Sequence, residues 1–232
     1  MSALVEINNI CKIYNPGENE VRALDHVSVS IDEGEFVAII GQSGSGKSTL
    51  MNMLGCLDVP TSGEYRLHGQ NVSELTDNEL SDIRNREIGF IFQGFNLIAN
   101  LTALENVELP LIYRGVPRGE RVRLARTALE KVGLGKRMEH KPAEMSGGQQ
   151  QRVAIARAIA QAPPIILADE PTGNLDSRST EEIMAILQEL YEEGRTVILI
   201  THNNEIADRA KRIIQIKDGK IESDTRTGTE NK

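Results

Sequence analysis

The chain has 232 residues, of which 39% are hydrophobic and 26% charged, proportions that are typical of a globular protein. This length can bury a sizeable core, and the formal net charge of −8 argues against a nucleic-acid partner held by bulk electrostatics. No apolar run approaches the roughly 20 residues that a membrane-spanning helix needs, and no secretory signal is visible. The two cysteines, Cys11 and Cys56, match no metal-binding spacing, so we expect buried, reduced thiols in a cytoplasmic protein.

The first third of the chain predicts an antiparallel β layer followed by the start of a buried sheet. Apolar and polar residues alternate over 5–7 and 27–31, which is typical of half-buried antiparallel strands. The run 36–40 is apolar throughout, as strands of a parallel sheet are when helices cover both faces. Residues 63–69 predict another short strand between two turns.

The middle of the chain predicts helices. Thr76 and Glu79 fit a capping box that would open a short helix over 77–86. A longer helix is expected over 117–132. Because residues 94–162 contain no strand-like run, this stretch is expected to be a helical subdomain inserted into the core.

The last third alternates strand and helix. The apolar runs 165–169 and 196–200 predict buried strands, and residues 178–192 between them carry an apolar stripe at helical spacing. This order predicts an α/β fold with a parallel sheet and right-handed crossovers. Residues 224–232 contain no apolar side chain and are expected to form a flexible tail.

A glycine-rich loop directly follows the predicted strand 36–40. From Gly41 to Ser48 it fits the pattern of a glycine, four residues and Gly-Lys-Ser, just before a helix that starts near Lys47. Backbone N–H groups of such a loop point at phosphate oxygens, the lysine reaches the β- and γ-phosphates, and the Ser48 hydroxyl can bind Mg²⁺. The loop predicts a nucleoside triphosphate site; the alternative is a glycine-rich turn without a ligand.

An acidic pair, Asp169 and Glu170, closes the predicted strand 165–169. Ligands bind at the carboxyl ends of strands in open α/β sheets, so Asp169 can hold Mg²⁺ there. Glu170 can polarise a water for in-line attack on the γ-phosphate. The alternative is an exposed acidic pair without a role.

A second anion site is predicted where Ser146, Gly147, Gly148 and Gln149 precede an Ala- and Ile-rich helix. One nucleotide does not need two such sites on one chain. We therefore expect a head-to-tail homodimer in which Ser146 serves the nucleotide bound by the other chain. The alternative is a plain helix cap.

In this combination the sequence resembles the ATP-binding cassette (ABC) family of transporter ATPases. The segment from Met145 to Gln149 is similar to the family's signature motif, and the resemblance covers residues 1–223 as a single domain. It implies a P-loop NTPase (RecA-like) parallel-sheet core with an antiparallel β layer and an inserted helical subdomain. The core would comprise residues 1–93 and 163–223, and the subdomain about 94–162.

The resemblance also implies roles for isolated residues. Tyr14 resembles the aromatic that stacks on adenine, Gln93 the glutamine that senses Mg²⁺ and the attacking water, and His202 the histidine that contacts the γ-phosphate. Asp176 ends a segment similar to the loop that couples the two sites of the dimer. Taken alone, Tyr14 is a strand-end tyrosine, Gln93 a loop amide and His202 a surface or capping histidine.

The full set of implied sites follows from the same resemblance, with ATP and Mg²⁺ as ligands. Nucleotide contacts are expected from Tyr14, Gly41, Ser43, Gly44, Ser45, Gly46, Lys47, Ser48, Thr49, Ser146, Gly147, Gly148, Gln149 and Asp176. Metal contacts are expected from Ser48, Gln93 and Asp169, and catalytic roles from Lys47, Gln93, Glu170 and His202.

Three further segments, 57–64, 92–111 and 168–176, are similar to the macrolide-export and lipoprotein-release (MacB/LolD-like) subfamily. This similarity implies a separate permease partner, a location on the inner face of the cell membrane, and export or extraction of an antibiotic, peptide or lipoprotein. The alternatives are a cell-division-type ATPase that regulates a cell-wall hydrolase through its permease, and an ABC ATPase that works without a permease. The sequence does not identify the substrate.

Five arginines gather in residues 114–126 with a single acid, Glu120, although the chain as a whole is acidic. Our hypothesis is that this arginine segment faces the permease or anionic lipid headgroups. The alternative is a solvated helix face. The arginines are Arg114, Arg118, Arg121, Arg123 and Arg126.

Overall fold

The computed structural model describes residues 3–17 and 19–226, which divide into two compact units. The described parts of 1–84 and 194–232 form the first unit, and residues 85–193 form the second. These bounds differ from the expected subdomain of residues 94–162. Strand β6 (Ile88–Phe92) and helix α6 (Ser177–Glu192) lie outside the expected subdomain. Both pack on α5 (Gly147–Ile159), so they group with the second unit rather than with the rest of the core.

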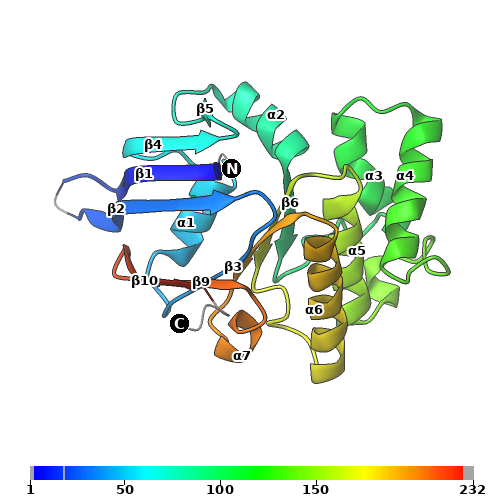
Figure 1. The fold of residues 1–232 in the computed structure, drawn as a ribbon. Helices are drawn as coiled ribbons and strands as arrows, with labels where there is room; N and C mark the ends of the chain where they lie inside the picture. The colour runs from blue at the N-terminus through cyan, green and yellow to red at the C-terminus, as the bar shows by residue number, and fades with distance from the viewer. Residues whose placement is uncertain (1–2, 18, 227–232) are drawn as a thin grey trace. The chain divides into compact units, whose positions relative to one another are not determined.

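The first unit contains an antiparallel sheet in the order β2-β1-β4-β5. Residues Val5 and Ile7 of β1 and Val27 of β2 are buried, which confirms the predicted half-buried strands. Both strands are longer than the alternation predicted, and in Figure 1 they run side by side with β4. The strands are β1 (Ala3–Tyr14), β2 (Val21–Asp32), β4 (Ser62–Leu67) and β5 (Gln70–Asn71).

The first unit also contains four strands of a second sheet, in the order β10-β9-β3-β8. The predicted strands β3 (Phe36–Ile40) and β8 (Thr196–Ile200) pair in parallel, and β9 (Arg212–Lys217) lies parallel to β3 on its other side. Strand β10 (Lys220–Arg226) returns antiparallel to β9. The chain therefore stays in a strand to Arg226, and the rest of the expected tail lies outside the described residues.

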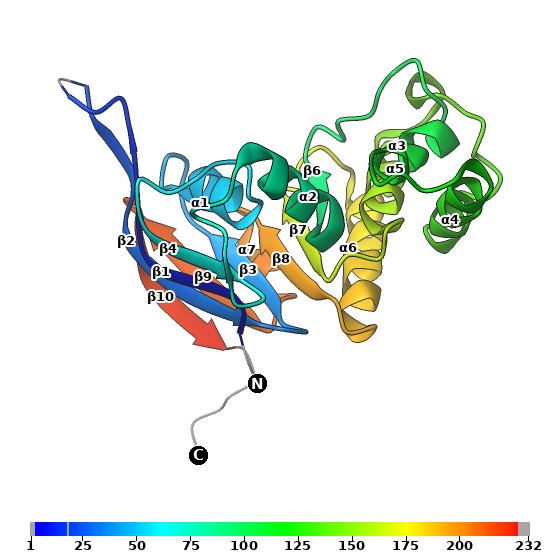
Figure 2. The ribbon, with the colours of Figure 1, turned by 90° about the horizontal axis from the view of Figure 1, so that it is seen from above.

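Three helices begin in the first unit. Helix α1 (Lys47–Leu54) follows the glycine-rich loop, and it lies beside the antiparallel sheet in Figures 1 and 2. Helix α2 (Asp77–Glu87) starts at the predicted capping box, in which the Thr76 N–H donates to Glu79 at 2.9 Å, and it ends in the second unit. Helix α7 (Asn204–Ala207) is a single turn after β8.

The second unit pairs two parallel strands, β6 (Ile88–Phe92) and β7 (Ile165–Asp169), and contains the helices of the middle of the chain. Residues 94–162 form helices and no strand, as predicted. Helix α5 packs against α3, α4, α6 and β6, which makes it the central element of this unit (Figure 1). The helices are α3 (Ala103–Tyr113), α4 (Arg118–Lys131), η1 (Pro142–Glu144), α5 (Gly147–Ile159) and α6 (Ser177–Glu192). Among the described residues, no helix combines the length and apolar character needed to cross a membrane.

One buried cation joins both sheets of the first unit. Arg212 on β9 is 8% exposed and donates to the Ser30 carbonyl on β2, to Glu35 and, through two nitrogens, to Asp224. Hydrogen bonds from Arg212 lower the pKa of Asp224 against the opposing effect of burial. The geometry is bidentate, the strongest arrangement for such a pair.

We predict that Arg212→Met lowers the free energy of unfolding by about 2 kcal/mol at neutral pH, because it leaves partly buried carboxylates without their cation. Urea denaturation measures the loss. The lowered pKa of Asp224 stabilises the fold above its unfolded pKa and ceases to do so as pH falls through the folded pKa, so the difference from wild type should shrink in acid. The exposed Arg226→Met is the control and should cost below about 1 kcal/mol. Equal losses for both variants would contradict the assignment.

Candidate functional site

The glycine-rich loop runs so close to neighbouring backbone that two of its residues have no room for a side chain. A Cβ on Gly41 would lie 2.3 Å from the Ile216 carbonyl oxygen of β9, and a Cβ on Gly46 would lie 2.6 Å from that of Ala23 on β2. Gly46 also has φ +106°, which favours glycine. The loop is therefore held against both sheets of the first unit by its backbone.

The groups that could bind a phosphate in this loop have no partner outside the loop itself among the bonds described below. Helix α1 begins at Gly46 without a side-chain cap, and the buried Ser45 hydroxyl has no hydrogen-bond partner among the described residues. The Lys47 ammonium donates to two carbonyls of the loop itself, those of Gly41 at 2.7 Å and Gln42 at 2.8 Å. A nucleoside triphosphate fits this arrangement, since its phosphates accept hydrogen bonds from free amides and from a lysine.

Tyr14 is held rigidly at the end of β1. Its hydroxyl donates to Asp58 at 3.0 Å, and the Lys12 ammonium lies 5.1 Å from the centroid of its ring and donates to the same carboxylate at 2.6 Å. Burial and the hydrogen bond to Asp58 raise the pKa of Tyr14, so the hydroxyl stays protonated. Lys12 and Asp58 fix the ring that was expected to stack on adenine, a role that the sequence predicted for neither residue.

His202 leaves the same sheet edge as the glycine-rich loop. Strands β3 and β8 are parallel neighbours, with Ile39 opposite Ile200, so Gly41 and His202 follow their carboxyl ends side by side. His202 is exposed, and the next residue, Asn203, caps α7. The first unit thus brings Tyr14, the loop and His202 together within one body.

In the second unit, Gln93 and Glu170 follow the carboxyl ends of two paired strands. Phe92 and Asp169 are paired at the ends of β6 and β7, so the residues after them lie next to each other. Gln93 exchanges two hydrogen bonds with Asn174, at 3.3 and 3.2 Å. This pairing ties the loop after β6 to the loop after β7.

Glu170 has an unusual backbone conformation. Its φ is +45°, in the left-handed region, although it is neither glycine nor asparagine. Strain of this kind is typical of functional sites and persists only where the surroundings impose it. A tight turn contributes, since the Gly173 N–H donates to the Glu170 carbonyl at 3.0 Å.

Ser146 opens α5 through a reciprocal capping box. The Gln149 N–H donates to the Ser146 hydroxyl oxygen at 3.3 Å, and the Ser146 N–H donates to the Gln149 side chain at 3.1 Å. A Cβ on Gly148 would lie 2.5 Å from the Ser179 hydroxyl oxygen of α6, so this turn is pressed against α6. The helix cap that was the alternative interpretation is therefore present, and Ser146 remains exposed at the helix start.

Three polar residues that support these loops carried no motif of their own. Arg157 on α5 donates to the carbonyls of Phe95 and Asn96, which follow Gln93 and both have positive φ. Asn106 on α3 is fully buried and bonds both the N–H and the carbonyl of Ile98. On α5, the third of them, Gln151, donates to the Pro171 carbonyl next to Glu170. The missed signal is a polar residue at a buried helical position.

The ABC transporter family matches residues 24–173 of this chain, well over half of its length. The chain belongs to the ABC transporter family. With the family, the predicted enzyme class, an ATPase, and the predicted P-loop NTPase fold are confirmed. An ABC transporter ATP-binding protein of Thermotoga maritima is 54% identical over 98% of this chain and 97% of its own length.

Longer relatives and solved structures of cassettes are also similar to this chain. The macrolide export ATP-binding/permease protein MacB of Hyphomonas neptunium is 56% identical over 96% of this chain. The chain spans about a third of the length of the MacB relatives it matches, 34% in that protein. Two dimeric structures of the ABC transporter cassette MJ0796, one in a post-hydrolysis state bound to ADP and Pi, each have a TM-score of 0.88 and 50% identity. Each covers 96% of this chain and 98% of the other.

The cassette uses Asp176 structurally. Its carboxylate caps α6 by accepting from the N–H and the hydroxyl of Ser179, both at 2.9 Å. These hydrogen bonds lower the pKa of Asp176. Any contact to nucleotide, as the resemblance implied, would have to come from a carboxylate already engaged in this cap.

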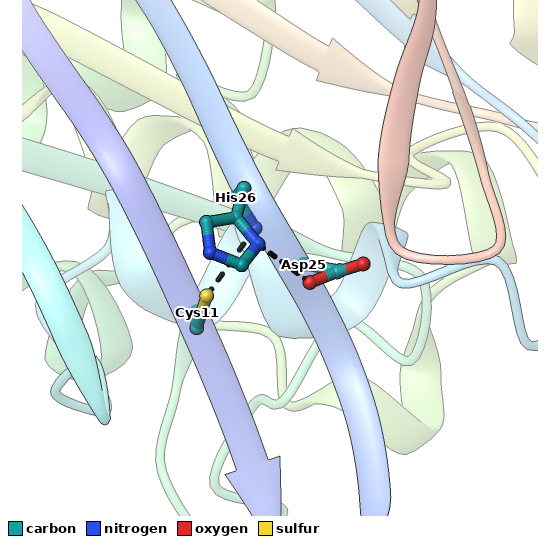
Figure 3. A group of neighbouring side chains, drawn as sticks. All are labelled: Cys11, Asp25 and His26. Atoms are coloured by element: carbon teal, nitrogen blue, oxygen red, sulfur yellow. Dashed lines mark hydrogen bonds and ion pairs between the residues drawn. The ribbon is translucent and has the colours of Figure 1, made fainter.

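One cluster in the cassette joins metal-ligating residue types that the spacing of the cysteines did not reveal. Figure 3 shows Cys11 on β1 close to Asp25 and His26 on β2, and their ligand atoms lie within 4.8 Å of one another. Asp25, however, already accepts from His26 at 2.7 Å and pairs with Arg22 and Lys220. Hydrogen bonds from Lys220 and His26 lower the pKa of Asp25. Because the positive charges of Arg22 and Lys220 would repel a metal ion, we assign no metal to this cluster.

The cysteines of the cassette are both buried free thiols, as predicted. Burial raises the pKa of Cys56 to about 11, so this thiol stays protonated at neutral pH.

The arginine segment is partly used inside the cassette. Arg121 donates to Glu108 at 2.7 Å, and Arg114 bonds the Gln161 side chain at 3.1 Å. Arg118, Arg123 and Arg126 are exposed. Fewer than five arginines are therefore available to form a basic surface.

We predict that Ser146→Ala lowers the free energy of unfolding by about 1 kcal/mol, because the cap of α5 is lost. Ser146→Asp should keep the cap and wild-type stability, since aspartate is an equally good capping residue. Urea denaturation of both variants is the measurement. Thr102→Ala, which removes the equivalent cap of α3, is the matched control. A neutral Ser146→Ala would mean that the capping geometry does not stabilise α5.

Proposed function

We propose that residues 1–223 act as one cassette of a homodimeric ABC transporter that hydrolyses ATP to drive a separate permease of the MacB/LolD type. Each ATP would bind between the glycine-rich loop of one chain and the Ser146 turn of the other. The observation that carries this proposal is the presence of two helix starts on one chain, α1 at Gly46, which has no side-chain cap, and α5 at Ser146, which is exposed. The structure of the MJ0796 cassette, which is dimeric and 50% identical to this chain, supports a dimer.

In the first unit, binding would begin with a change of partners. The Lys47 ammonium leaves the carbonyls of Gly41 and Gln42 for the β- and γ-phosphates, and the free amides of α1 and the Ser45 hydroxyl gain acceptors. Tyr14 stacks on adenine. Ser43, Gly44 and Thr49 complete the cradle around the triphosphate.

Mg²⁺ suits the remaining donors, which are all oxygen atoms: the Ser48 hydroxyl, the Asp169 carboxylate and the Gln93 amide. When bound, the ion neutralises charge that develops on the phosphates. Glu170 polarises the attacking water, and His202 stabilises the γ-phosphate. The products, ADP and Pi, are those bound to the MJ0796 cassette in its post-hydrolysis state, which supports this reaction.

Closing of the dimer would perform the mechanical work, transmitted to the permease. MacB relatives at 53–56% identity carry a cassette and a permease in one chain, which supports a permease partner for this cassette. We propose a position on the inner face of the membrane and a role in export or extraction.

Glu170→Gln tests the shared site. The variant should bind MgATP but hydrolyse it about a hundredfold or more slowly, because the water loses its base. It should therefore accumulate as an ATP-bound dimer, which size-exclusion chromatography with light scattering will detect.

Ser146→Asp in the Glu170→Gln background is the control for that experiment. It keeps the cap of α5 but sets a negative charge against the partner's γ-phosphate, so the dimer should not form. A Glu170→Gln chain that stays monomeric with MgATP, with and without permease, would contradict the shared site.

The exposed arginines favour a charged contact with the permease. Arg123→Glu with Arg126→Glu should reduce recovery of the cassette with permease-containing membranes. Each arginine near an anionic surface contributes about 1 kcal/mol to the binding free energy, and the variant loses these contributions. Lys136→Glu, an exposed reversal outside the segment, is the control. Unchanged recovery would contradict the contact, and equal loss on protein-free anionic vesicles would assign it to lipid.

A further inference from the structure

The backbone at Glu170 is strained in two ways at once. Its φ of +45° lies in the left-handed region, and the next residue is Pro171, whose ring favours an extended conformation in the residue before it. Such a conformation costs of order 1–3 kcal/mol and needs contacts that hold it in place. Contacts to the residues beside Glu170 therefore help to hold this conformation.

One of these contacts comes from the signature helix. The Gln151 side chain on α5 is 0% exposed and donates from Nε2 to the Pro171 carbonyl at 2.8 Å. Its Oε1 is also buried and accepts no hydrogen bond in the described part of the chain. Only this orientation of the amide gives the Pro171 carbonyl a donor from Gln151, and a buried carbonyl that loses its donor is costly.

Gln151 therefore connects two features that would serve different nucleotides. It lies five residues after Ser146 on the same helix, and α5 is rigid through its packing on α3, α4, α6 and β6. If the proposed function holds, Ser146 touches the partner's ATP while Glu170 acts on the ATP of its own chain. The Gln151–Pro171 bond then links the helix that begins at Ser146 to the residue next to Glu170.

We propose that Gln151 is a positioning residue: it holds the strained Glu170–Pro171 turn on α5 and couples the hydrolytic geometry of one ATP site to engagement of the other. This inference rests on the proposed function of Glu170 and Ser146. Movement of α5 towards the partner's γ-phosphate carries the Pro171 carbonyl with it, which sets the direction of the Glu170 carboxylate.

Gln151→Met in the full chain tests the proposal, since methionine has similar length and volume but no donor. The kcat for MgATP should fall about tenfold to a hundredfold, as a misplaced base would cause, while KM and nucleotide affinity stay within about twofold. Gln150→Met is the matched control. Gln150 is the preceding residue on α5, and its amide donates to the Met145 carbonyl at 3.2 Å. It should retain wild-type kcat.

A double-mutant cycle separates positioning from simple loss of folded protein. In the Glu170→Gln background, Gln151→Met should leave the residual hydrolysis rate unchanged, because no base remains to be positioned. A purely structural role would lower the rate by the same factor in both backgrounds, and that result would overturn the proposal. So would a wild-type kcat in Gln151→Met.

The same cycle distinguishes failure of the proposed function. If Glu170→Gln itself hydrolyses ATP at the wild-type rate, Glu170 is not the base and the proposed function fails first. If Glu170→Gln is inactive while Gln151→Met and Gln150→Met both match wild type, only the role of Gln151 is wrong. Thermal unfolding of each variant shows that the assays use folded protein.

Discussion

Backbone packed against backbone, with no side chain between, is the constraint on which the first unit depends. The glycine-rich loop contacts the carbonyls of Ile216 and Ala23 at distances that exclude a Cβ at Gly41 and Gly46. The Gly219 N–H, in the turn between β9 and β10, donates to the Ser45 carbonyl at 2.9 Å, and the Asp25 N–H donates to the Gly219 carbonyl at 2.8 Å. Loop, hairpin turn and β2 are thus fixed to one another by main-chain contacts.

The second unit meets a similar demand with polar side chains. Its loops after β6 and β7 carry residues with positive φ, namely Phe95, Asn96 and Glu170. Main-chain groups at or beside these turns are bonded by side chains from neighbouring positions, Arg157 and Gln151 from α5 and Asn174 from the loop itself. Burial lowers the pKa of Arg157, which nevertheless remains charged and donates to two carbonyls. Helix α5 therefore holds the loops after β6 and β7 in place, in addition to presenting Ser146 at its first turn.

The sequence allowed prediction of elements with a strong local pattern. Uniformly apolar runs marked β3, β7 and β8, and the capping pair Thr76–Glu79 marked α2. The hairpin β9–β10 was missed although Asp218-Gly219 between apolar residues is a strong turn signal, because Arg212, Gln215 and Lys217 interrupt the run.

Motif residues and their supports differ in the same respect. Lys47, Ser146 and Glu170 each belong to a motif. The residues of each motif lie together in one loop, so their spacing along the chain is fixed. Asp58, Arg157 and Gln151 act on residues far away in sequence, 44, 62 and 20 positions from their partners, and such distances leave no periodic pattern. Their roles depend on tertiary contacts, which one sequence does not display.

The start of α1 has a wider consequence. Helices α3, α5 and α6 each begin with a side chain that caps them, whereas α1 begins at Gly46 with none. A bound triphosphate would take the place of that absent residue and complete the helix. The substrate then acts as a temporary part of the polypeptide's own architecture, and stability of the first unit becomes a function of nucleotide concentration. In a cell, such a cassette would be most resistant to unfolding and proteolysis when ATP is plentiful.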